Sequence, residues 1–330
     1  AGAPARRCAL FGSRGCNVSA IAPMASSERR FCWGLAYRMT GSPYDADDIA
    51  QEVWLRLSQS PPDDLQRSLR PWLARVTVNL SRDALRARKR SYVGPWLPPP
   101  VEDEFLRERD FDPSAEERLL LRDQAQYAYL IALAALSAKE RAVTILQDVC
   151  DYSVREVAAA LAISEANVKV LHHRAKRKLA LAGPLPEPVK RSDPVFERVE
   201  RFIAALTIAD VALVESLLAD DIIVVSDGGG EHFAARVPVV GVGKVAKMYI
   251  NITKRSLAAA TSFGLELRVL HGAPAVVMTV ESASNGGSTL PHISALLFEL
   301  NDVGKIRRIY SVSASRKLKE LRGGSSHPAQ

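Results

Sequence analysis

The spacing of hydrophobic positions divides the chain into two helical blocks and a mixed C-terminal part. From residue 31 to 91, and again from about 114 to 182, apolar residues recur at three- and four-residue steps, which predicts helices throughout. The stretch YVGPWLPPPVEDE lies between these blocks, and its prolines exclude a helix core there. A second proline-rich segment, GPLPEPVKRSDP at 183–194, predicts a linker after the second block.

The pattern after this linker predicts an α+β domain. Two amphipathic helices are expected over 194–218, followed by the apolar run IIVVSD, which predicts a buried strand. VGKVAKMYINITKR predicts another helix, and four further apolar runs with short Gly, Pro or polar breaks predict strands. We expect the helices to pack against a curved antiparallel sheet that encloses a pocket.

One helix of the first block carries an acidic face. Ser42-Pro43 predicts its start, with an N-cap hydroxyl and a proline at the first helical position. The face comprises Asp45, Asp48 and Glu52, with Asp47 and Gln51 beside them. Acids near a helix N-terminus are favoured by the helix dipole, which is the simpler explanation, but such a face can also dock a basic partner.

A second helix, expected to open at Pro71, carries a polar, basic stripe. The stripe comprises Arg75, Asn79, Arg82, Arg86 and Lys89 (or Arg90). Five basic residues fall within 82–90 against one acid, which exceeds what a solvated face requires. Lysine and arginine in such a row neutralise successive phosphates, and an asparagine can hydrogen-bond base edges. Trp72, Tyr92 and Trp96 flank the stripe and can stack on bases, although core packing also suits Trp72.

The most specific pattern in the chain is a helix-turn-helix. Ser153 starts a short helix, Ile163-Ser164 makes the turn, and Ser164 caps a second helix. The expected exposed side of this second helix carries Asn167, Lys169, His173, Arg174 and Arg177, as entry into the major groove requires. Adjacent histidines on a helix, here His172 and His173, point about 100° apart, so we expect no metal site.

Composition indicates the kind of partner and excludes several protein classes. The 330 residues are 47% hydrophobic and 25% charged, which is typical of a globular chain of two or three domains. A net charge of +7 favours an acidic partner, with nucleic acid first. The cysteines are expected to be free thiols in a reducing compartment: Cys8, Cys16, Cys32 and Cys150. No apolar run approaches the roughly 20 residues that span a bilayer, so no membrane association is expected.

The glycines after IIVVSD look at first like a phosphate-binding or catalytic loop. A Walker loop needs GxxxxGK[ST], whereas Gly241-Val242-Gly243-Lys244 lacks the first glycine and Val245 replaces the hydroxyl residue. The stretch Gly228–Gly230 leads toward Glu231-His232 instead of a helix. We therefore expect a tight turn with positive φ angles and no nucleotide.

The first 183 residues resemble the extracytoplasmic-function (ECF) sigma factors, small bacterial promoter-recognition subunits. DADDIAQEVWLRL is similar to the region 2 helix that grips core RNA polymerase, and YSVREVAAALAISEANVKVLHHRAKRKL is similar to region 4, which reads the −35 element. RPWLARVTVNLSRDALRARKR resembles the helix that melts and reads the −10 element, with Asn79 in the base-contacting position.

This resemblance implies a role for each patch. Core polymerase would bind Asp45, Asp48, Gln51 and Glu52; −10 DNA would bind Arg75, Asn79, Arg82, Arg86 and Lys89; and −35 DNA would bind Asn167, Lys169, His173, Arg174 and Arg177. The protein would initiate transcription in the cytoplasm and perform no chemistry itself.

YVGPWLPPP resembles the linker of an ECF subgroup with a fused C-terminal SnoaL-like domain, which carries a DGGG motif. This implies a regulatory interface toward the sigma blocks, formed by Asp227, Gly228, Gly229 and Gly230. Two companion motifs depart from the subgroup: NGxPA is His271-Gly272-Ala273-Pro274-Ala275 here, and NPxKL is Ser313-Ala314-Ser315-Arg316-Lys317-Leu318.

The expected architecture is multidomain, with two all-α sigma domains and a C-terminal α+β SnoaL-like cone. The expected parts are a disordered tail (1–28), region 2 (29–91), an extended linker (92–113), region 4 (114–183), a proline-rich linker (184–193), the cone (194–320) and a second tail (321–330). We expect no cofactor.

Two alternatives concern the cone. It can be an active SnoaL-type cyclase or isomerase, for which the nominal acid–base residues are Asp227, His232, Glu266, Glu281 and His292. It can also be a sensor for a small hydrophobic ligand.

Overall fold

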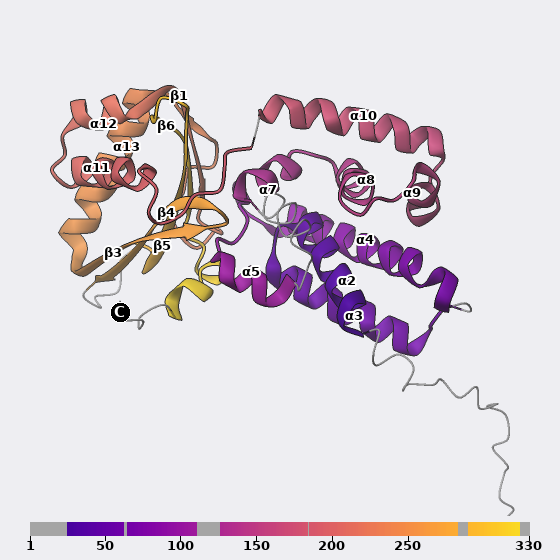
Figure 1. The fold of residues 1–330 in the computed structure, drawn as a ribbon. Helices are drawn as coiled ribbons and strands as arrows, with labels where there is room; N and C mark the ends of the chain where they lie inside the picture. The colour runs from indigo at the N-terminus through magenta and orange to yellow at the C-terminus, as the bar shows by residue number, and fades with distance from the viewer. Residues whose placement is uncertain (1–24, 63–64, 111–125, 184, 283–289, 324–330) are drawn as a thin grey trace, which may run out of the picture.

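The computed structural model describes residues 25–62, 65–110, 126–183, 185–282 and 290–323. A helical part and a sheet domain lie side by side, and the helix at 127–134 lies between them (Figure 1). None of the described helices is long and apolar enough to cross a bilayer. Cys32 and Cys150 are free thiols, whereas Cys8 and Cys16 lie outside the described residues.

The region that resembles sigma region 2 contains the helices α2 (Ala25–Thr40), α3 (Pro43–Gln59) and α4 (Leu65–Ser91). A further helix, α5 (Asp103–Asp110), follows within the expected linker. The start of α3 is as predicted, since the Ser42 hydroxyl accepts a hydrogen bond from the Asp45 amide at 3.2 Å.

Three predicted boundaries in this region are wrong. Helix α4 begins at Leu65 and continues through Pro71, because burial of Leu69 and Leu73 in the core outweighs the one hydrogen bond that proline removes. Helix α2 begins at Ala25, inside the expected tail. The linker is extended only to about residue 102, because acids at its end favour the first turn of α5 and Leu106 of that helix is buried.

The region that resembles sigma region 4 contains the predicted helix-turn-helix. Its helices are α7 (Tyr127–Ala134), α8 (Ala138–Asp148), α9 (Val154–Leu161) and α10 (Glu165–Ala182). Ser153 and Glu156 form a capping box at the start of α9, and the Ser164 hydroxyl caps α10. The expected start of this block, residue 114, lies outside the described residues.

The helices of the two regions pack on each other around a common apolar cluster. Leu35 and Met39 of α2 and Val78 of α4 share this cluster with Val157 of α9 and Val168 of α10. Helices α8 and α9 therefore lie against α2 and α4, and α10 packs on α8 and α9 (Figure 1). We call this packing the closed arrangement.

The C-terminal domain has the predicted helices and strands and one further short strand, β2. They are α11 (Val195–Thr207), α12 (Val211–Leu217), β1 (Leu218–Asp227), β2 (Val239–Val240), α13 (Val242–Ala259), β3 (Ala260–Leu270), β4 (Ala273–Ser282), β5 (Ile293–Leu300) and β6 (Ile306–Val312). The sheet order is β2-β1-β6-β5-β4-β3. The expectation of a purely antiparallel sheet is wrong, because β1 pairs with β6 in parallel. Helix α13 carries the chain across the sheet, and the three-step meander from β3 then ends alongside β1.

Each face of the sheet has its own core. Leu296 and Phe298 face α11–α13, where Phe298 packs edge-on against Phe202. Leu297 faces the opposite way, into a cluster that includes Leu97 of the linker and Tyr127 of α7. The linker and α7 thus cover one face of the sheet.

The C-terminal end of the described chain closes this second core. It forms two short 3₁₀ turns, η1 (Ser315–Lys317) and η2 (Glu320–Gly323). Leu321, expected to lie in a tail, is buried there because it packs against the sheet.

Candidate functional site

The second helix of the helix-turn-helix presents one continuous polar face. Val168 and Ala175 are buried on one side of α10. The residues predicted to read the −35 element are all exposed: Asn167, Lys169, His173, Arg174 and Arg177. His172 points elsewhere and contacts Asp148 of α8 through its Nε2 at 2.8 Å. The geometry suits groove entry by this face.

The predicted −10 stripe lies along the surface of α4. Arg75, Asn79, Arg86 and Lys89 are exposed and Arg82 is half-buried. Arg86 forms an exposed ion pair with Asp83 at 2.9 Å, which is weak enough to exchange for a phosphate contact. The flanking aromatic residues are placed differently: Trp72 packs against the region 2 core, and Tyr92 and Trp96 contact charged groups described below.

The residues of the acidic face of α3 differ in their exposure and in their partners. Asp48 and Gln51 are exposed, and Glu52 pairs with Arg56 on the surface at 2.8 Å. Asp45 instead accepts a hydrogen bond from the Arg88 guanidinium of α4. Burial lowers the pKa of Arg88, although Asp45 opposes this shift.

Asp227 is the centre of a buried polar network between the two halves of the protein. Its carboxylate accepts hydrogen bonds from the Tyr92 hydroxyl, from the Leu97 amide at 2.8 Å, from the Gly229 amide at 2.9 Å and from the Lys317 ammonium at 2.5 Å. Lys317 also donates to the Leu97 carbonyl at 2.5 Å. Tyr92, Leu97, Asp227 and Lys317 form what we call the Asp227 network.

The charges of this network are removed from water. The side chain of Asp227 is 0% exposed and that of Lys317 is 5% exposed. Burial lowers the pKa of Lys317 to about 8, although Asp227 holds it up. Such a pair persists only while both partners remain in place.

Trp96 connects the Asp227 network to region 2. The Arg88 guanidinium lies 3.7 Å from the centre of the Trp96 ring, and the Lys317 ammonium lies 4.3 Å from it. A continuous series of contacts therefore runs from Asp45 through Arg88, Trp96 and Lys317 to Asp227.

The three glycines fit this network for steric reasons. Gly229 and Gly230 have φ angles of 63° and 78°, as the predicted turn requires. A Cβ on Gly229 would lie 2.7 Å from that of Ala314, and one on Gly228 would overlap the carbonyl of His232. Glycine is thus needed where the loop meets η1 and the linker.

The hairpin between β3 and β4 makes a second buried contact with the sigma blocks. His271, which replaces the asparagine of the related motif, has a φ of 50° and is 2% exposed. Its Nδ1 lies 3.3 Å from the Tyr37 hydroxyl of α2, and its Nε2 lies 3.2 Å from the Pro99 carbonyl. The Gly272 amide donates to Asp103 at 3.1 Å. The motif in the sequence predicted this hairpin, whereas no sequence pattern pointed to its partners Tyr37, Pro99 and Asp103.

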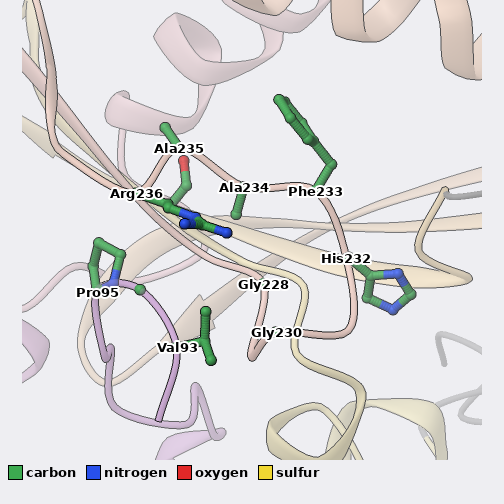
Figure 2. A pocket seen from close by; sticks show the side chains of 11 residues that line it. Val93, Pro95, Gly228, Gly230, His232, Phe233, Ala234, Ala235 and Arg236 are labelled. Atoms are coloured by element: carbon green, nitrogen blue, oxygen red, sulfur yellow. The ribbon is translucent and has the colours of Figure 1, made fainter.

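A cavity of about 390 Å³ lies beside the glycine loop. Figure 2 shows Val93 and Pro95 of the linker on one side, with Ala234 and Arg236 of the loop on the other. Phe233 at its edge is 91% exposed, and His232 turns to Ser315, with Nε2 and Oγ 3.2 Å apart. The walls are mainly apolar.

The nominal acid–base residues do not converge on one cavity. Glu266 pairs with Arg268 on β3, and Glu281 is exposed on β4. The Nδ1 of His292 lies 2.9 Å from the Val280 carbonyl. No cluster with metal-binding composition occurs among the residues that the structure describes.

Comparisons with known proteins agree with this arrangement. The Sigma-70 region 2 model matches residues 24–91 and the Sigma-70 region 4 model matches residues 128–179. The ECF RNA polymerase sigma factor SigJ of Mycobacterium tuberculosis is 32% identical over 234 residues, covering 69% of this chain and 71% of its own length. The probable ECF RNA polymerase sigma factor SigI of the same organism is 28% identical over 302 residues, covering 90% and 96%.

A solved structure shares the whole fold. The crystal structure of the M. tuberculosis extracytoplasmic function sigma factor SigJ covers 91% of this chain and 98% of its own, with a TM-score of 0.63 at 24% identity. The shared fold includes the six-stranded sheet domain as well as the helical regions. Both sigma regions and the identity to SigJ show that the chain belongs to the ECF RNA polymerase sigma factors.

Proposed function

We propose that this ECF sigma factor is restrained by its own C-terminal domain, which stabilises the closed arrangement through the Asp227 network. Its family function is promoter-specific initiation of transcription by RNA polymerase. The observation that carries the proposal is the buried Asp227 carboxylate, two of whose four donors belong to the linker between the sigma blocks. Separation of the linker from the cone would break both contacts.

The dimensions of a promoter explain why the closed arrangement restrains activity. The −35 and −10 elements are about 25 base pairs apart, or roughly 85 Å along B-DNA. Helix α4 has 27 residues and is therefore about 40 Å long, and α9 and α10 pack within the same apolar cluster as α4. The two reading faces must therefore move apart before they bind both elements.

We assign the exposed patches to the partners of a sigma factor. Core RNA polymerase binds the acidic face of α3, where Asp45 joins Asp48, Gln51 and Glu52 once Arg88 releases it. Promoter DNA binds the stripe on α4 and the polar face of α10. These partners place the protein in the cytoplasm.

The cone acts as a regulatory domain and catalyses no reaction, since its acid–base residues are dispersed. Its cavity beside the glycine loop favours one additional role. A small hydrophobic ligand between Val93 and Ala234 would touch the linker and the loop at once and so change the stability of the Asp227 network.

Promoter binding by the full-length protein tests the restraint. Asp227→Ala should bind a fork-junction promoter fragment more tightly than the wild type does, and run-off transcription with core polymerase should rise. The matched control is Asp221→Ala, on the same strand, whose side chain is exposed and pairs only with surface Arg307 among the described residues. Equal promoter affinity of wild type and Asp227→Ala would contradict the restraint.

A further inference from the structure

A second cavity lies where region 2, the linker and region 4 meet. Its volume is about 320 Å³, and its lining includes Arg88 and Lys89 of α4, Tyr92 and Trp96 of the linker, and Arg141 of α8. Three cations and no carboxylate are among the residues that line it. The cavity therefore gathers positive charge at a place where helices pack against each other.

Arg141 is a buried cation with no counter-ion among the residues that the structure describes. The residue is 6% exposed, and its Nη1 donates to the Met39 carbonyl of α2 at 2.5 Å. Its Nε is buried and has no hydrogen-bond partner in the described part of the chain. No carboxylate there forms an ion pair with it, and burial together with Arg88 lowers its pKa to about 10. A buried guanidinium in this state is costly unless an anion joins it.

The other groups of the cavity define the kind of anion. Arg88 is already paired with Asp45, so Arg141 and the exposed Lys89 are the cations left to neutralise. Trp96 has Arg88 and Lys317 against its ring, and Tyr92 has Lys317 against its ring, so both aromatic rings already pack against a cation. Guanidinium and ammonium groups together suit phosphoryl oxygens.

We propose that this cavity binds a small phosphate-bearing anion of the pyrophosphate class. Promoter DNA is a poor alternative source of the phosphate, because Arg141 lies beneath the joined surfaces of α2 and α8 and a duplex cannot reach it. The proposed ligand is therefore small enough to enter the cavity.

This site exists only in the closed arrangement. Lys89 belongs to region 2 and Arg141 to region 4, so separation of the two regions takes its cations apart. A ligand that binds one state stabilises that state, and at 100 times its Kd it would reduce the open fraction about 100-fold. This effect of the anion on the open fraction rests on the proposed function, in which the closed arrangement restrains activity.

Isothermal titration calorimetry of the full-length protein with sodium pyrophosphate tests the site directly. We expect saturable binding of one pyrophosphate per chain. Lys89→Gln and Arg141→Gln should each weaken it at least tenfold. The matched control is Lys139→Gln, which removes an exposed positive charge from α8 outside the cavity lining and should leave binding unchanged. Lys89 is exposed, so its variant remains informative if Arg141→Gln fails to fold.

Two results would overturn the proposal. They are the absence of saturable pyrophosphate binding and an equal loss of pyrophosphate binding in Lys139→Gln and Lys89→Gln. The binding readout is independent of the restraint: if pyrophosphate binds as expected while Asp227→Ala leaves promoter affinity unchanged, the site stands and the restraint fails.

Discussion

The substitution Asp227→Asn removes one charge from the Asp227 network and almost no volume. In the closed arrangement the Lys317 ammonium would then remain buried with only the Leu97 carbonyl and the asparagine oxygen as acceptors. Removal of one partner of a buried ion pair costs about 3–5 kcal/mol. Deprotonation of Lys317 limits this cost, since a shift from its ordinary pKa of 10.5 to pH 7 corresponds to roughly 5 kcal/mol.

After opening, water solvates Lys317, so this cost falls on the closed state. We therefore expect the equilibrium to move toward the open state by about 3 kcal/mol or more, a factor on the order of 100. Fluorescence anisotropy with a labelled fork-junction promoter fragment measures the effect as a gain in affinity.

The control Asp221→Asn lies on the same strand but in an exposed ion pair, for which about 1 kcal/mol or less is expected. If Asp227→Asn binds the promoter fragment within a factor of two of both wild type and control, the reasoning is refuted.

Three further predictions concern the same surfaces. Gly229→Ala should destabilise the closed arrangement by about 1–3 kcal/mol, because φ at this position is 63° and the new Cβ would meet Ala314. Faster hydrogen exchange of residues 92–101 would show this destabilisation, and protection equal to that of the wild type would contradict it. Asn79→Ala should impair promoter melting, followed by 2-aminopurine fluorescence, more than core polymerase binding, and an equal loss of both would remove its assignment. The pKa of Lys317 is about 8 in the closed state, against its ordinary value of 10.5 after opening. Below pH 8 the residue is protonated in both states, so its titration does not change the free energy of opening. Between pH 8 and 10.5 only the closed state loses the proton, so opening should cost more, by about 3 kcal/mol at most. Promoter affinity should fall over that interval in the wild type and not in Lys317→Met, and identical pH profiles would contradict the assignment.

Local signals predicted the elements that carry the reading faces. The hydroxyls of Ser153 and Ser164 marked both helix starts of the helix-turn-helix, since a cap is a contact within three residues. The glycines after Asp227 predicted a turn with positive φ, because glycine adopts that backbone without a steric cost.

Contacts between distant segments could not be predicted in this way. Asp227 meets Lys317 and Tyr92 across 90 and 135 residues, and neither spacing carries a periodic signal. The parallel pairing of β1 with β6 could not be predicted for the same reason, because it depends on the path of α13 and not on the hydrophobic pattern of either strand. The expected helix start at Pro71 is wrong, because tertiary packing of the preceding turn outweighs the local preference of proline for a first helical position.

Asp45 shows how a single pattern can serve two purposes. Its position on α3 fits the face that we propose binds core polymerase, yet in the closed arrangement it pairs with Arg88. The same carboxylate thus connects the acidic face to the Asp227 network through Arg88 and Trp96.

The distance between α3 and α10 in solution tests the restraint most directly. Dyes attached at Ser58 and Lys176, both exposed and outside the assigned interfaces, would report it by single-molecule energy transfer in the full-length protein. The restraint predicts one short-distance population in the wild type and a large shift to long distances in Asp227→Asn. Identical distance distributions in the two proteins would contradict it.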